Sequence, residues 1–220
     1  MADAPPADPA ADPHTAPHWP TAALVTIDTQ VDVLDRGALA VPGTSAVLPE
    51  VISLVEAFRS AGRPIVHVVR LYPADAGDVD RVRRSLVASG AAVLRPGTPG
   101  AELAPGLVPA GFRLDPGVLL AGAAQPIGPD EVVVYKPRWG AFYRTPLAEH
   151  LAARGVDTVV VAGCNFPNCP RTTLYEASER DYRVVLAADA TSGLSEQGRA
   201  EVAAIGVVVV DAAAVRATLR

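Results

Sequence analysis

The chain has 220 residues, of which 50% are apolar and 20% are charged, so it can bury one substantial core. Its formal net charge is −5 and it has no long run of Lys and Arg, which argues against a nucleic-acid partner. The sequence contains neither an apolar segment long enough to span a bilayer nor the features of a secretory signal, so we expect no membrane contact and a cytoplasmic location.

The first twenty residues differ in composition from the rest. They hold six prolines and six alanines but no Lys or Arg. Such a segment cannot bury enough apolar surface to order itself. The sequence therefore predicts a disordered Pro/Ala-rich tail over residues 1–20 and a single domain over residues 21–220.

From Ala22 onward, short β-branched runs alternate with amphipathic stretches. Strands are predicted at 23–28, 64–69, 131–135, 158–162, 183–187 and 207–210. Helices are predicted from about Thr44 to Gly62, at 145–154, 171–180 and 195–205, and from 212 onward. Residues 71–130 form a long excursion with one short helix near 78–88.

The strand runs are almost entirely apolar, as parallel strands covered on both faces would be. With helices between most of them, they predict an α/β fold of three αβα layers with a doubly wound, mostly parallel, six-stranded sheet. In such a fold the ligand crevice lies beyond the carboxyl ends of the strands.

Three residues with reactive or charged side chains lie at predicted strand ends. Asp28 closes the first run, Lys136 follows the run at 131–135, and Cys169 comes just after the run at 158–162, where a helix begins. A helix N-terminus favours a thiolate, a carboxylate can accept its proton, and an ammonium group can stabilise it. Taken singly, they could be a turn-capping Asp, a solvated Lys and a small buried Cys. If the three side chains lie together at one edge of a sheet, they predict a cysteine nucleophile.

Four segments then resemble one family, the isochorismatase-like cysteine hydrolases, which include nicotinamidases, N-carbamoylsarcosine amidase and streptothricin hydrolase. The segments are LVTIDTQVD at 24–32, GTPGAE at 97–102, VVVYKPRWGAF at 132–142 and GCNFPNC at 163–169. The resemblance implies that Asp28, Lys136 and Cys169 are the catalytic residues. They would hydrolyse a C–N bond of an amide, carbamoyl or lactam-type small molecule through a thioester on Cys169. It also implies a homo-oligomer, either a dimer or a tetramer.

The resemblance further implies how the tetrahedral oxyanion is stabilised. One donor would be the backbone N–H of Cys169. A second would come from a turn with a cis peptide between two non-proline residues, which corresponds here to the bond between Asn165 and Phe166. The bond between Phe166 and Pro167 is the alternative, because a cis bond before proline costs less.

No metal or other cofactor is expected. The nicotinamidases of this family bind a metal through an Asp-x-His arrangement after the second strand, whereas His67 here lies inside that strand and the Asp-x-His at 12–14 lies in the tail. Possible pocket residues near the catalytic positions, each with ordinary packing or loop hydrogen bonding as its alternative, are Gln30, Trp139, Phe142, Tyr143 and Phe166.

Three other functions are alternatives to this one. An isochorismatase that cleaves a vinyl ether would not need the nucleophile Cys169. A nucleotide-binding module would have a Gly-x-Gly-x-x-Gly turn after the first strand, where this chain has Asp28-Thr-Gln-Val-Asp32. A non-catalytic small-molecule-binding relative stays open, although it would have little need for the three reactive residues together.

Overall fold

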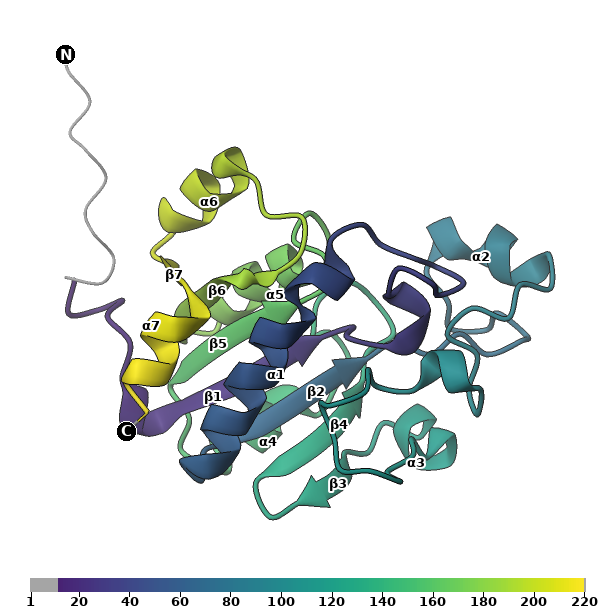
Figure 1. The fold of residues 1–220 in the computed structure, drawn as a ribbon, viewed down its shortest axis with the longest axis horizontal. Coiled ribbons are helices and arrows are strands. Elements are labelled where there is room, and N and C mark those ends of the chain that lie inside the picture. The colour runs from purple at the N-terminus through teal and green to yellow at the C-terminus, as the bar shows by residue number, and fades with distance from the viewer. Residues whose placement is uncertain (1–11, 220) are drawn as a thin grey trace.

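The computed structural model describes residues 12–219, which build one seven-stranded sheet with the order β3-β4-β2-β1-β5-β6-β7 (Figure 1). The strands are β1 (Ala22–Ile27), β2 (Ile65–Val69), β3 (Gln125–Gly128), β4 (Glu131–Tyr135), β5 (Thr158–Gly163), β6 (Arg183–Thr191) and β7 (Val208–Val210). All neighbouring pairs are parallel except β3 and β4. The α/β fold with a mostly parallel sheet is confirmed.

The prediction of six strands was wrong by one. β3 is an edge strand that pairs antiparallel with β4 only, and its residues are at most partly buried. It contains Pro126 and Gly128, which are both disfavoured in strand interiors. An edge position tolerates them, but they leave no apolar run that sequence patterning can detect.

Helices cover both faces of the sheet (Figure 1). They are α1 (Thr44–Ser60), α2 (Arg81–Ala88), α3 (Pro116–Leu120), α4 (Leu147–Ala152), α5 (Cys169–Ser178), α6 (Glu196–Ala203) and α7 (Ala212–Ala217). Three short 3-10 turns are η1 (Trp19–Thr21), η2 (Val31–Val33) and η3 (Pro99–Ala101). α1 and α7 share an apolar cluster with one face of the sheet, and α4, α5 and α6 share another with the opposite face.

The central strand β1 contributes side chains to both apolar clusters. Successive side chains of a strand point to opposite faces. Accordingly Leu24 packs under α1 and α7, whereas Val25 and Ile27 pack against the α4, α5 and α6 layer. All six residues of β1 are buried, so the residue that follows it is held on a rigid support.

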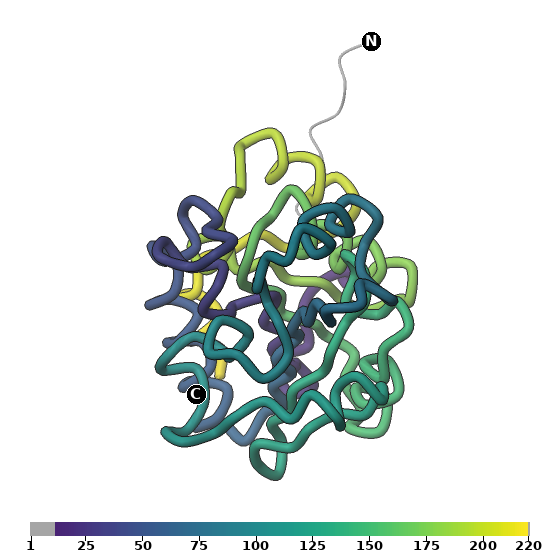
Figure 2. The backbone as a smooth tube through the Cα atoms, turned by 90° about the vertical axis from the view of Figure 1, so that its right-hand side faces the viewer, coloured from purple at the N-terminus to yellow at the C-terminus, as the bar shows by residue number. Residues whose placement is uncertain are grey.

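The first part of the excursion at 71–130 crosses the carboxyl end of the sheet, whereas residues 101–119 pack on its α1 face. Figure 2 looks at the molecule from this end, and the blue and teal part of the chain lies across the front. α2 and the loops around it share a small apolar cluster of their own, formed by Tyr72, Val79, Val87, Val93 and Leu94. This part of the excursion therefore packs as a cover over the strand ends.

The predicted tail differs from the structure in its second half. Residues 1–11 lie outside the described residues, but residues 12–20 pack against the domain. The backbone N–H of His18 donates to Thr158 Oγ1 at 2.9 Å, and its ring Nδ1 lies 2.6 Å from Asp157 Oδ2. Polar groups at the start of β5 thus supply partners that composition alone does not reveal.

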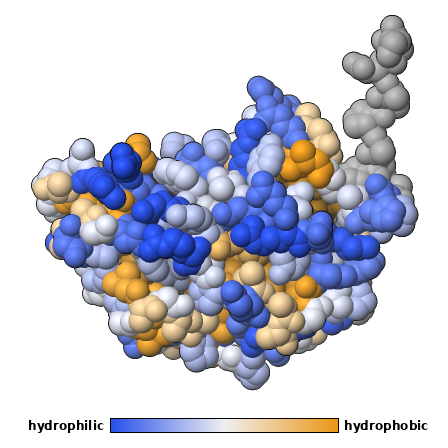
Figure 3. All heavy atoms as spheres, turned by 180° about the vertical axis from the view of Figure 1, so that it is seen from behind, coloured by the Kyte–Doolittle hydropathy of each residue, from blue (hydrophilic) through white to orange (hydrophobic). Residues whose placement is uncertain are grey.

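The outer surface of the α4, α5 and α6 side is mostly hydrophilic, with apolar residues in patches between polar ones (Figure 3). Large apolar residues that remain exposed are Val82, Leu120, Tyr143 and Ile205. Over residues 12–219, none of the helices combines the length and the apolar character needed to cross a bilayer.

Candidate active site

The ends of three strands bring Asp28, Lys136 and Cys169 together. Lys136 Nζ donates to Asp28 Oδ2 at 2.8 Å, and both side chains are almost completely buried. Cys169 lines the same small cavity as Asp28. The three residues therefore meet at the carboxyl edge of the sheet, where the sequence had placed them.

Asp28 follows β1 at the point where the strand order reverses, with β2 on one side and β5 on the other. Its backbone has a φ of 49°, in the left-handed region that Asp and Asn tolerate better than most residues. Its N–H donates to Val68 O at 2.9 Å, which fastens this turn to β2. Such strained positions are common at functional sites, where the surrounding structure enforces them.

Lys136 follows β4, and its N–H donates to Val69 O at 3.0 Å. Besides Asp28, the ammonium group donates to Arg138 O at 3.3 Å. Its side chain has no exposed surface. A lysine buried to this extent needs a charged partner, and Asp28 is that partner.

Cys169 is the first residue of α5, and the path to it depends on Gly163 at the end of β5. Gly163 has a φ of 120°, and a Cβ atom there would lie 2.3 Å from Ile27 O. The next residue, Cys164, donates its N–H to that same oxygen at 2.9 Å. Only glycine allows the two strands to approach this closely before the chain turns toward Cys169.

The Cys169 thiol differs from the sequence-based expectation of a favoured thiolate. Burial, and after it the negative charge of Asp28, raise the pKa of Cys169 to about 11 against the opposing effects of Lys136 and Arg70. The resting group is therefore a protonated thiol at neutral pH. Formation of a thiolate requires transfer of the proton to an acceptor in the site.

The cis peptide predicted between Asn165 and Phe166 was wrong. Within residues 12–219 every peptide bond is trans, including the one before Pro167. The turn closes without a cis bond because Phe166 N–H donates to Ser192 O at 2.7 Å and Asn168 N–H donates to Asn165 O at 3.0 Å. These bonds already bring the chain to the start of α5.

Arg70 is a further residue of the site that was not predicted. It follows β2, and its Nη2 lies 3.6 Å from Cys169 Sγ and 2.6 Å from Arg138 O. Its guanidinium forms a buried ion pair with Asp80 and lies 5.0 Å from the centre of the Trp139 ring. The signal was present in the sequence, because Arg70 is a charged residue at a strand end, like Asp28 and Lys136.

The cavity at Cys169 has a volume of about 40 Å³. It is lined by Asp28, Val33, Leu39, Val41, Arg70, Tyr72, Arg83, Leu94, Trp139, Cys164, Asn165, Asn168 and Cys169. The loop before α1 and the segment around α2 supply much of this lining.

One of the five predicted pocket side chains, Trp139, lines this cavity. Gln30 does not, because its side-chain amide donates to Arg70 O and Ala101 O and accepts from Arg70 N–H. Phe142 packs in the core with its ring centre 5.7 Å from that of Tyr182.

The other two predicted side chains also lie elsewhere. Tyr143 is 48% exposed and is outside the cavity. Phe166 is buried among apolar side chains of the core, and its ring leaves no room for a Cβ atom at Gly198. For Gln30, Phe142 and Phe166, ordinary packing or hydrogen bonding was the correct interpretation, whereas Tyr143 lies at the surface.

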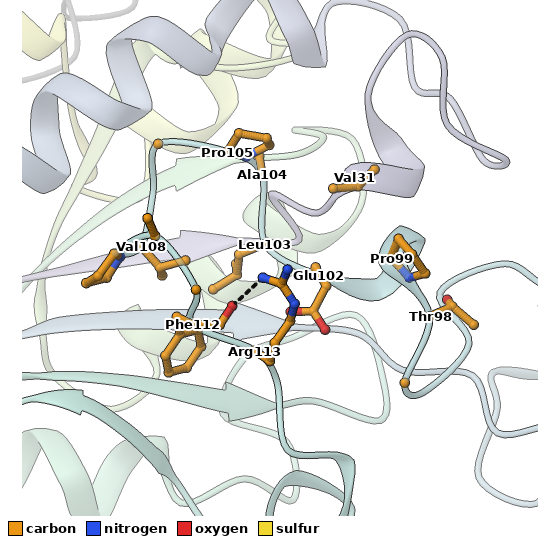
Figure 4. Close-up of a pocket in the computed structure, with 15 residues that line it drawn as sticks. Val31, Thr98, Pro99, Glu102, Leu103, Ala104, Pro105, Val108, Phe112 and Arg113 are labelled. Atoms are coloured by element: carbon orange, nitrogen blue, oxygen red, sulfur yellow. Dashed lines mark hydrogen bonds between the residues drawn. The ribbon is translucent and has the colours of Figure 1, made fainter.

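A second, larger cavity of about 660 Å³ lies on the other side of η2, between Val31 and the loop of residues 97–113 (Figure 4). Asp28, Lys136 and Cys169 are not part of its lining. Its walls are mainly proline, glycine and aliphatic side chains, and Arg113 there donates to Phe112 O at 2.8 Å. The reactive groups therefore belong to the smaller cavity.

His67 links Thr26 and Glu131 in a hydrogen-bonded chain. His67 Nδ1 lies 2.8 Å from Thr26 Oγ1, and its Nε2 lies 2.9 Å from Glu131 Oε1. Across residues 12–219, no three His, Cys, Asp or Glu side chains are grouped as a metal ion would require.

The sequence matches the isochorismatase domain family over residues 22–115 and 115–214. It is 33% identical over 186 residues to a probable inactive nicotinamidase from Arabidopsis thaliana, and the match covers 83% of this chain and 86% of that protein.

Solved structures agree with this match. An isochorismatase family protein from Desulfovibrio vulgaris has a TM-score of 0.77 and 34% identity, over 90% of this chain and 98% of that one. N-carbamoylsarcosine amidase from Thermoplasma acidophilum has a TM-score of 0.68 and 25% identity, over 87% of this chain and 96% of that one. The chain therefore belongs to the isochorismatase-like hydrolase family.

Proposed function

We propose that the protein is a cysteine hydrolase that cleaves a C–N bond of a small amide, carbamoyl or lactam-type substrate. The observation that carries this proposal is the buried pair of Lys136 Nζ and Asp28 Oδ2, 2.8 Å apart, beside the cavity lined by Cys169. A nucleophile, a proton acceptor and a cation in one site are the parts that acyl transfer needs. The amidase among the structural relatives supports the same chemistry.

The first step forms the nucleophile. Asp28 accepts the proton of Cys169, whose pKa of about 11 keeps it a thiol until then. Lys136 and Arg70 stabilise the thiolate through their positive charges. Coupling this proton transfer to substrate binding would protect the sulfur from unproductive reactions.

The next steps exchange the bonds of the carbonyl carbon. The thiolate attacks this carbon, and the backbone N–H of Cys169 at the start of α5 donates to the oxyanion. When the tetrahedral intermediate collapses, the C–N bond breaks and protonated Asp28 gives its proton to the departing nitrogen. Asp28 then activates a water molecule, which hydrolyses the thioester and releases the carboxylic acid and the free thiol.

A non-catalytic binding protein is the second candidate. One observation favours it, namely that the relative from Arabidopsis thaliana is described as probably inactive. The vinyl ether reaction is less well supported, because it makes no use of Cys169.

An ammonia-release screen over primary amides and carbamoyl compounds, together with a mass-spectrometric screen for ring opening of lactams, tests the proposal. It is paired with mass spectrometry of the acyl adduct, using Cys169→Ala as control. Both cysteines lie in one tryptic peptide, 155–171, so fragmentation must assign the adduct to Cys169 rather than Cys164. Turnover with an adduct on Cys169 is expected. Neither turnover nor adduct across the screen would favour the binding protein.

The expected homo-oligomer stays a prediction. Light scattering of the purified protein would test it, and a monomer at micromolar concentration would contradict it.

A further inference from the structure

Asp32 is a buried carboxylate that the proposed mechanism does not use. It lies in η2, four residues after Asp28, and is 6% exposed. None of the salt bridges within residues 12–219 involves it. Its oxygens accept from backbone N–H groups instead, Oδ2 from Leu94 at 2.6 Å and Oδ1 from Ala38 at 3.4 Å. Burial of a carboxylate is costly unless hydrogen bonds compensate it, so these bonds are what the residue contributes.

The two bonds of Asp32 reach two separate walls of the cysteine cavity. Leu94 belongs to the excursion after α2, and Ala38 belongs to the loop before α1. Leu94 and Leu39, the neighbour of Ala38, both line the cavity. The N–H of Leu39 also donates to the backbone oxygen of Asp32 at 2.9 Å. Asp32 is not part of the lining, so it acts on the cavity from behind these two leucines.

Leu94 has an unfavourable backbone conformation that its neighbours enforce. Its φ of 46° lies in the left-handed region, which leucine rarely adopts. Its N–H is held by Asp32 Oδ2, and its carbonyl oxygen accepts from Tyr72 N–H at 2.9 Å. Strained residues of this kind persist only where surrounding contacts fix them. The bond to Asp32 is therefore one of the contacts that hold Leu94 against the cavity.

The carboxylate of Asp32 has its place because Gly100 has no side chain. A Cβ atom on Gly100, which lies in η3, would be 2.2 Å from Asp32 Oδ1. The N–H of Val31 donates to Glu102 O at 2.9 Å, and this bond fastens η2 to η3. The position of the carboxylate is thus set by contacts outside the cavity.

We propose that Asp32 is a positioning residue that sets the width of the cysteine cavity. It holds Leu94 on one side and the loop at Leu39 on the other, and so limits the size of the group that can reach Cys169. This inference rests on the proposed function, because Cys169 is the group that the cavity serves. Without the carboxylate, the strain at Leu94 is released and the wall gives way.

The size limit can be measured by alkylation of Cys169 with a small reagent, iodoacetamide, and a bulky one, N-phenylmaleimide. Mass spectrometry with peptide fragmentation gives both rates. Their ratio is compared between variants, because the thiolate fraction affects both rates equally and cancels. Asp32→Asn should shift this ratio about tenfold in favour of the bulky reagent, as the loss of one hydrogen bond allows. Asp32→Ala should shift it at least as far.

Two control variants separate the width of the cavity from charge and from stability. Asp35→Asn removes the same charge at an exposed position close by. Val215→Ala destabilises the buried core at α7 and leaves the cavity wall intact. Both should keep the wild-type ratio.

Amide hydrogen exchange supplies a second readout that a general loss of stability would not give. In Asp32→Asn, exchange should become about tenfold faster at residues 37–41 and 91–95. Exchange in the central strands β1 and β5 should stay at the wild-type rate. Faster exchange across the strands as well would mean that Asp32 only stabilises the fold, and would refute the inference.

Gly100→Ala displaces the carboxylate without changing Asp32 itself. The added Cβ should shift the labelling ratio in the same direction as Asp32→Asn. Gly128→Ala is the matched control, because a Cβ there has no atom within 4 Å. Circular dichroism shows which variants are folded. If Asp32→Asn is not folded, Gly100→Ala decides.

The outcomes separate this inference from the proposed function. A wild-type labelling ratio in folded Asp32→Asn or folded Gly100→Ala refutes the role of Asp32, even when the wild-type protein hydrolyses amides. If the ratio shifts as expected but the wild-type protein neither turns over a substrate nor forms an acyl adduct on Cys169, the role of Asp32 stands and the hydrolase proposal fails.

Discussion

Lys136 Nζ lies 2.8 Å from Asp28 Oδ2, and the lysine of this pair has no exposed surface. The second carboxylate oxygen of Asp28 is buried and has no hydrogen-bond partner within residues 12–219. One oxygen is thus committed to a cation while the other is free to accept a proton. This division of roles in a single side chain is the basis of the proposed mechanism.

Replacing Asp28 by Asn should lower kcat by about a thousandfold or more, because the amide cannot accept the proton of Cys169. Asn tolerates the left-handed backbone at this position, but Lys136 loses its charged partner, so circular dichroism must show that the variant is folded. Steady-state kinetics on any substrate found in the screen measure the effect. Asp35→Asn, at an exposed position, serves as control. Turnover of Asp28→Asn within tenfold of the wild-type rate would exclude Asp28 as the base.

Replacing Lys136 by Met should destabilise the fold by about 3–5 kcal/mol, because Asp28 is left as an unpaired buried charge. The double variant Asp28→Asn with Lys136→Met removes both charges and should regain part of that loss. Urea unfolding of the wild-type protein, both single variants and the double variant gives the coupling energy. Strictly additive single effects would mean that the two groups do not interact.

The alkylation rate of Cys169 should rise about tenfold for each pH unit between pH 7 and 9. The reason is that its pKa of about 11 leaves only a small thiolate fraction in this range. Because the positive charge of Arg70 lowers this pKa, Arg70→Met should slow the reaction at pH 8. Iodoacetamide labelling followed by mass spectrometry measures both effects. A rate that levels off below pH 8 would show that the resting group is already a thiolate.

The fold should lose stability in acid through Glu131. Burial raises its pKa, but hydrogen bonds from His67 and Arg59 outweigh this and lower it from 4.5 to about 2. Because the folded-state pKa lies below the unfolded one, the stabilisation is complete above about pH 4.5 and is lost as the pH falls toward 2. Its size is about 3 kcal/mol. Urea unfolding at pH 7 and pH 3 should show a smaller difference for Glu131→Gln than for the wild-type protein, and an equal difference would contradict the assignment.

Gly163→Ala should destabilise the protein by about 2 kcal/mol or more. The added Cβ would meet Ile27 O at 2.3 Å, and the φ of 120° is unfavourable for alanine. Gly128→Ala is the matched control, because a Cβ there has no atom within 4 Å. Thermal unfolding compares the two, and a similar melting temperature for both would contradict the proposed close approach.

The strands that carry the site could be predicted because they are buried on both faces. The apolar run at 131–135 has the same limits as β4, and the residue after it is Lys136. Parallel strands end at a common edge, so reading the residue after each run places the charged groups correctly. The same rule applied to β2 identifies Arg70, which is the residue after that strand.

Other features could not be predicted because they depend on contacts between distant segments. The trans turn at Phe166 is held by Ser192 O, more than twenty residues further along the chain. Phe166 itself resembles a pocket aromatic in the sequence, but Gly198 leaves space for its ring in the core. An aromatic residue that is next to a reactive residue in the sequence therefore does not have to point into the site.

Both cysteines of the chain, Cys164 and Cys169, line the same small cavity. A fluorophore, spin label or covalent fragment that reacts with thiols can therefore attach nowhere else on this molecule. Covalent ligand discovery can therefore be directed at this cavity without engineering a labelling position.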